Sequence, residues 1–76
     1  MRTFWWDFFG PDARGTAEHF VRHTEQFLGR EGLHGCRTGV LEQEGAWSAW
    51  CACPSQWEEA IRRALRPRRE TDAPPT

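Results

Sequence analysis

The spacing of apolar residues divides the chain into two kinds of segment. Short runs containing aromatic or β-branched residues lie at residues 2–9, 36–42 and 46–53, and their length and composition are typical of β-strands. In residues 13–29 and 57–66, apolar residues instead recur every three to four positions. That spacing places them on one face of a helix. The predicted order of elements is therefore β-α-β-β-α.

Capping and breaking residues support these boundaries. Asp12 is suited to the N-cap of the first helix. Pro54 ends the third strand, and Ser55 with Glu58 three residues later has the sequence of a capping box. We therefore predict one domain over residues 1–66. The remainder, residues 67–76, is polar and rich in proline, which indicates a disordered tail.

The turn between the second and third strands decides which side chains share a face of the sheet. Glutamate disfavours a positive φ, so Glu44 and Gly45 make a poor type I′ turn. We expect instead a type I turn followed by Gly45 in the left-handed conformation, which places Thr38 opposite Trp50. A shift of one residue in this register would move every side chain of one strand to the other face.

The predicted fold is α+β, with a three-stranded antiparallel sheet and two helices on one face. A right-handed connection through the first helix lets the third strand lie between the first and second. This arrangement is a ferredoxin-like split βαβ fold that lacks the last strand. The residues expected between sheet and helices are Phe4, Trp6, Phe8, Phe20, Val21, Phe27, Leu28, Leu41, Trp47, Trp57, Ile61 and Leu65.

The opposite face of this sheet is the predicted functional surface, because no segment remains to cover it. An exposed apolar patch of this kind usually marks an interaction site. The first strand would also have an unpaired edge, which favours pairing with a second copy. We therefore expect a non-enzymatic interaction module, most simply a homodimer. The predicted partner-binding residues are Thr3, Trp5, Asp7, Phe9, Thr38, Val40 and Trp50.

Composition adds an alternative partner. The 76 residues include five tryptophans, five phenylalanines and no tyrosine, and the formal net charge is −1. That charge gives the whole chain no general attraction to nucleic acid. Trp5 and Trp50 could nevertheless stack on bases, and the arginine-rich segment 62–69 could contact phosphate. The alternative function is therefore binding of RNA or single-stranded nucleic acid.

Neither a metal nor another cofactor is expected. His19 and His23 have a spacing that can chelate a metal, and Cys51 and Cys53 could add thiolates. The histidines fall off the apolar stripe, however, and cysteines two apart in a strand are typical of core residues. The predicted register also places Cys36 and Cys53 on opposite faces, which argues against a disulfide, although a one-residue shift would bring them opposite each other.

No catalytic centre is predicted either. His34 and Cys36 are close in sequence, but no acid is placed to orient them, and a chain of this size has little room for a shielded pocket. No apolar run reaches the length of a membrane span. With three cysteines and no secretion signal, we expect reduced thiols and a cytoplasmic location.

Overall fold

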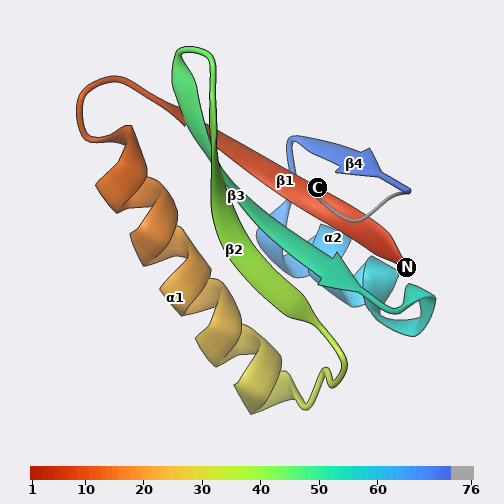
Figure 1. The fold of residues 1–76 in the computed structure, drawn as a ribbon. Coiled ribbons are helices and arrows are strands. Elements are labelled where there is room, and N and C mark those ends of the chain that lie inside the picture. Colours follow the sequence, from red (N-terminus) through yellow and green to blue (C-terminus); the bar gives the residue numbers. More distant parts are fainter. Residues whose placement is uncertain (73–76) are drawn as a thin grey trace.

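The computed structural model of the chain describes residues 1–72 and contains one four-stranded antiparallel sheet with two helices (Figure 1). The sheet order is β2-β3-β1-β4. As predicted, β3 lies between β1 and β2. The last residues of the predicted tail, 73–76, lie outside the described range. The elements are β1 (Arg2–Phe9), α1 (Ala13–Glu31), β2 (Arg37–Gln43), β3 (Ala46–Cys53), a 3₁₀ turn (Ser55–Trp57), α2 (Glu58–Leu65) and β4 (Arg69–Thr71).

Both helices pack against the same face of the sheet, and Trp6 contacts both of them. Its ring centroid lies 4.8 Å from that of Phe20 on α1. Its indole Nε1 donates a hydrogen bond of 2.8 Å to the carbonyl of Leu65 at the end of α2. Phe4 and Ile61 are fully buried in the same layer. The predicted core between sheet and helices is therefore present, with Leu41 as the exception explained below.

The predicted count of three strands is wrong, because β4 pairs with β1 along Thr3–Trp5. The Arg68 amide donates to the Trp5 carbonyl at 2.8 Å. Glu70 then accepts two hydrogen bonds of 2.8 Å from the guanidinium of Arg62 on α2. Residues 69–71 are thus a strand where a disordered tail is predicted. A segment of three residues without an apolar side chain carries no strand signal in its sequence.

The predicted hairpin register is also wrong, by one residue. Gln43 pairs with Ala46, so the connecting turn contains only Glu44 and Gly45. Gly45 has φ of 74°, while Glu44 does not have a positive φ. A type I′ turn needs both residues at positive φ, and this turn needs only the glycine there. Glu44 therefore does not prevent a two-residue turn, because this turn is not of type I′.

This shift reverses the faces of β2. Thr38 now pairs with Cys51 and Val40 with Ala49, so both lie on the helix-covered face rather than on the predicted partner-binding face. Leu41 moves in the opposite direction, from the predicted core to the open face, where 39% of its surface is exposed. Cross-strand partners share a face, so one turn residue accounts for all three corrections.

The predicted capping interactions do not form, although the helices do. Neither α1 nor α2 has a side-chain hydrogen bond at its N-cap, and Ser55 belongs to a 3₁₀ turn that precedes α2. Helix α1 ends at Gly32, whose φ of 70° is the left-handed conformation typical of a glycine C-cap. Neither helix is both long enough and apolar enough for a membrane span, within the described residues 1–72.

Candidate functional site

The face of the sheet opposite the helices is the candidate functional surface. We call it the open face. Its side chains form cross-strand rows, because directly paired residues point to the same side of an antiparallel sheet. Read from β2 toward β4, the two central rows are Gly39, Trp50, Trp5 and Arg69, and then Leu41, Ser48 and Asp7.

Trp5 lies on the open face but is buried, with only 5% of its surface exposed. The guanidinium carbon of Arg69 lies 4.5 Å from the centroid of its ring, a distance typical of a cation–π contact. The indole Nε1 donates a hydrogen bond of 3.0 Å to the hydroxyl of Thr71. Strand β4 therefore covers Trp5, which a partner cannot reach without displacing Arg69.

Arg69 also holds a polar cluster beside Trp5. Its guanidinium donates to both carboxylate oxygens of Asp7, at 3.1 and 3.2 Å, and to Oε1 of Gln43 at 3.3 Å. Ser48 donates to the same Asp7 carboxylate. Burial raises the pKa of Asp7, but these hydrogen bonds and the nearby arginine charges outweigh it and hold the pKa below its ordinary value. Asp7 therefore accepts hydrogen bonds that stabilise the open face.

Trp50 extends from β3 over β2, and the glycine there makes room for it. A Cβ atom built on Gly39 would lie 2.6 Å from Cζ2 of the Trp50 ring, closer than Cβ atoms in proteins approach their neighbours. Gly39 is paired directly with Trp50, and β2 is an edge strand of the sheet. The half-buried indole of Trp50 is thus brought to the β2 edge of the molecule.

The apolar side chains still accessible on the open face are few. Leu41 is 39% exposed and Phe9 is 68% exposed. Leu41 lies on β2 beside the row that contains Trp50, whereas Phe9 pairs with Ala46 at the hairpin end of the sheet. The accessible apolar surface therefore has two parts, one along β2 and one at the end of β1.

The structure separates the seven predicted partner-binding residues. Thr3 is fully buried, and Thr38 donates its hydroxyl to Glu25 of α1 at 2.8 Å on the helix-covered face. Phe9 and Trp50 are the two that are at least partly exposed on the open face without belonging to the Arg69 cluster. Leu41 was missed, since the predicted register had placed it in the core.

The arginine-rich segment is partly neutralised. Arg62 forms ion pairs with Glu58, Glu59 and Glu70 at 2.8–3.2 Å, and its hydrogen bond to Glu70 lowers the pKa of that carboxyl. Arg69 is paired with Asp7. The exposed arginines of the segment are Arg63, Arg66 and Arg68. Two of the residues predicted to contact nucleic acid, Arg62 and Arg69, therefore form ion pairs within the chain. A third, Trp5, is covered by Arg69.

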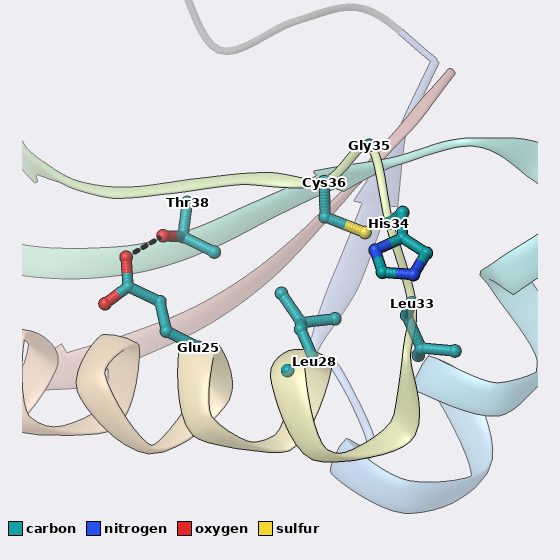
Figure 2. Close-up of a pocket in the computed structure, with 8 residues that line it drawn as sticks. Glu25, Leu28, Leu33, His34, Gly35, Cys36 and Thr38 are labelled. Atoms are coloured by element: carbon teal, nitrogen blue, oxygen red, sulfur yellow. Dashed lines mark hydrogen bonds between the residues drawn. The ribbon is translucent and has the colours of Figure 1, made fainter.

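A shallow pocket lies between α1 and the start of β2 and includes His34 and Cys36 (Figure 2). Glu25 and Thr38 form its far side, joined by their hydrogen bond. Burial raises the pKa of the Cys36 thiol, so the group is not activated as a nucleophile. No hydrogen bond joins the Cys36 and His34 side chains in the described part of the chain.

The cysteines and the histidine pair lie in different places. Cys36, Cys51 and Cys53 are free thiols, and Cys51 and Cys53 are fully buried. His19 and His23 are exposed on α1. Among residues 1–72, no group of three or more histidine, cysteine or acidic side chains is arranged to hold a metal ion. The mixed site considered from the sequence is not assembled.

Comparison with known proteins gives no further identification. No protein-family model matches the chain, and neither the curated proteins nor the solved structures contain a significant match.

Proposed function

We propose that this chain is a small non-enzymatic interaction module that forms a homodimer by pairing the outer edges of two β2 strands. One observation carries the proposal: β2 ends the sheet, and its outer edge is paired with no strand among residues 1–72. An unpaired edge presents backbone donors and acceptors that another strand can satisfy. The three unpaired thiols support a reducing, cytoplasmic setting for this dimer.

Strand β2 lacks several of the devices that usually protect edge strands, although Arg37 and Glu42 give it a charged residue near each end. Its seven residues contain no proline and no lysine, and they pair with β3 in continuous register from Arg37 to Gln43, without a bulge. Proteins commonly use these devices to prevent edge-to-edge association. The other edge of the sheet is β4, with three residues, which is too short to offer a comparable template.

A two-fold pairing centred on Val40 is self-complementary. In an antiparallel pair about that residue, Gly39 lies opposite the partner's Leu41 on the open face. The Trp50 ring lies over Gly39, so the partner's Leu41 would contact the edge of the indole. Leu41 is 39% exposed in the single chain and would become buried. The same contact occurs twice by symmetry.

The charges of the strand also suit this arrangement. Arg37 lies at one end of β2, and Glu42 and Glu44 lie at or just beyond the other end. Antiparallel pairing about Val40 places Arg37 opposite the partner's Gln43 and Glu42 opposite the partner's Thr38. Two like charges directly opposite each other would destabilise the pair, and this register contains none.

The proposed edge differs from the one expected from the sequence. The edge of β1 was the expected route to a dimer, and β4 occupies it along Thr3–Trp5. We also infer that the sheet, with β4 added, has the complete ferredoxin-like split βαβ arrangement. That likeness supports the fold only, because folds of this kind serve many functions.

The test is the oligomeric state of matched variants, measured by size-exclusion chromatography with light scattering over a range of concentrations. Leu41→Lys places a charge at the proposed contact and should convert dimers to folded monomers. Phe9→Ser removes a more exposed apolar side chain on the same face, distant from β2, and should leave the dimer intact. Circular dichroism of both variants verifies that they are folded.

Two results would overturn the proposal. A wild-type chain that stays monomeric at high concentration would exclude it. A dimer that is lost in Phe9→Ser and kept in Leu41→Lys would place the contact at the end of β1. The alternative, nucleic-acid binding, would instead give a monomer that binds single-stranded oligonucleotides with an affinity that falls steeply with salt.

A further inference from the structure

The His19 and His23 side chains converge on the outer surface of α1. Their Nε2 atoms lie 2.9 Å apart, and their ring centroids are 4.4 Å apart with an angle of 69° between the planes. Both residues are exposed. The four-residue spacing places them on adjacent turns of a helix, so the backbone itself holds the two rings together.

We propose that His19 and His23 form a chelating site for a divalent transition metal ion, bound through both Nε2 atoms. Without metal, one ring donates a hydrogen bond to the other. When the donor ring shifts its proton to Nδ1, both Nε2 lone pairs become available. Neutral imidazole is a common ligand of copper, nickel and zinc. Water would complete the coordination shell, since both side chains face solvent.

The distance between the two nitrogens indicates which metals fit. Metal–imidazole bonds of 2.0–2.1 Å are typical, and with Nε2 atoms 2.9 Å apart they give an N–metal–N angle of about 90°. That is the angle between neighbouring ligands in square-planar or octahedral coordination. Copper(II) and nickel(II) prefer such geometries, whereas zinc prefers tetrahedral ones. The site therefore suits Ni²⁺ or Cu²⁺ better than Zn²⁺.

The neighbouring groups leave the site accessible. Glu18 forms an ion pair with Arg14 at 3.3 Å, so its carboxylate interacts with that arginine rather than with either histidine. A Cβ atom built on Gly15, one turn before His19, would meet no heavy atom within 4 Å apart from its chain neighbours and the backbone of its own helix. The third histidine, His34, lies in the loop before β2 and is separate from the pair. It provides the matched control.

The experiment is calorimetric titration of the untagged chain with Ni²⁺, which avoids the oxidation of thiols by copper. Wild type should bind one ion, and His19→Ala and His23→Ala should each weaken binding at least tenfold. His34→Ala should bind as wild type does. Retention on an immobilised Ni²⁺ column should follow the same order.

The site would be refuted if wild type shows no saturable binding to Ni²⁺. It would equally be refuted if the two α1 variants bind as tightly as wild type, since the ion would then be held elsewhere. Zn²⁺ titrated in the same way should bind more weakly than Ni²⁺, and tighter zinc binding would contradict the proposed geometry. Both substitutions are on an exposed helix face, so circular dichroism should confirm unchanged folding.

Discussion

At the scale of single residues, the positions of two tryptophans on the open face each depend on one specific neighbour. Trp50 can lie over β2 because Gly39 has no side chain. Trp5 is buried because Arg69 lies above its ring. These dependencies explain why Trp5 and Trp50, which occupy paired positions on adjacent strands, differ in exposure.

The contact between Trp50 and Gly39 gives the first prediction. Gly39→Ala should lower the free energy of unfolding by about 1–3 kcal/mol, because the added methyl group overlaps the indole and must displace it. Urea denaturation measures the change. The matched control is Gly15→Ala in α1, where the space is open, and the substitution should stabilise the protein by about 0.5–1 kcal/mol. A Gly39→Ala variant as stable as wild type would contradict the placement of Trp50.

Asp7 gives a prediction about pH. Its pKa is lowered in the folded state, so the folded chain binds fewer protons than the unfolded chain at acidic pH. The stabilisation is therefore present above the ordinary aspartate pKa of 3.8 and is lost as the pH falls through the lower, folded-state pKa. On the acid limb of the stability curve, the free energy of unfolding falls as the pH is lowered. Asp7→Asn should make this fall less steep, as measured by denaturation between pH 2 and 6. A limb that keeps its slope in Asp7→Asn would contradict this role of Asp7.

At the scale of elements, the sequence predicts what has a repeated pattern and misses what depends on one residue. Both helices and the first three strands follow from apolar spacing sustained over several turns or strand positions. The register of β2 depends on a single turn, in which Gly45 takes the positive φ and Glu44 does not. Strand β4 depends on ion pairs to α2 and β1, such as Arg62 with Glu70. No local pattern encodes such distant pairs.

The candidate site, too, could be predicted from the sequence only in part. The sequence identified an open aromatic face and placed Trp5, Trp50 and Phe9 on it. It could not reveal that Arg69 covers Trp5, since β4 was not expected. Nor could it place Leu41 on the open face, because the register was shifted. The edges of the sheet are those of β2 and β4, and the edge of β1 is occupied by β4.

Removing β4 tests its role as a cover. A chain ending at Arg66 should expose Trp5, shift the tryptophan emission to longer wavelength and lose about 1.5–3 kcal/mol of stability, the usual value of burying one large apolar side chain. Arg69→Ala keeps the backbone pairing of β4 and should have a smaller effect on both measurements. An unchanged unfolding midpoint in the shortened chain would show that β4 adds nothing to the fold.

The layer between sheet and helices gives a prediction for the thiols. Iodoacetamide should label Cys36 in the native protein and leave Cys51 and Cys53 unmodified, because the latter two are fully buried. Labelling of Cys36 should be slow at neutral pH and faster at alkaline pH, since burial raises its pKa. Burial also raises the pKa of Cys53 to about 12. Mass spectrometry counts the adducts, and equal labelling of all three cysteines without denaturant would contradict the structure.

At the scale of the whole molecule, the proposed dimer has a distinctive size. The single chain has a radius of gyration of 11.7 Å over its Cα atoms. Strands lie about 4.8 Å apart, so joining two four-stranded sheets edge to edge separates their centres by about 19 Å. The radius of gyration should then rise to about 15 Å. Small-angle X-ray scattering should show this rise with concentration for wild type and a constant, monomeric value for Leu41→Lys.

The pairing of β4 with β1 also brings the beginning and the end of the described chain together. Arg2 forms an ion pair with Asp72 at 3.0 Å, on the edge of the sheet opposite β2 (Figure 1). A short peptide linker between these residues, with a new opening cut at the Glu44–Gly45 turn, should give a circular permutant with the same fold. Fluorescent labels attached near residue 2 would lie at the two distant margins of the proposed dimer, clear of its contact.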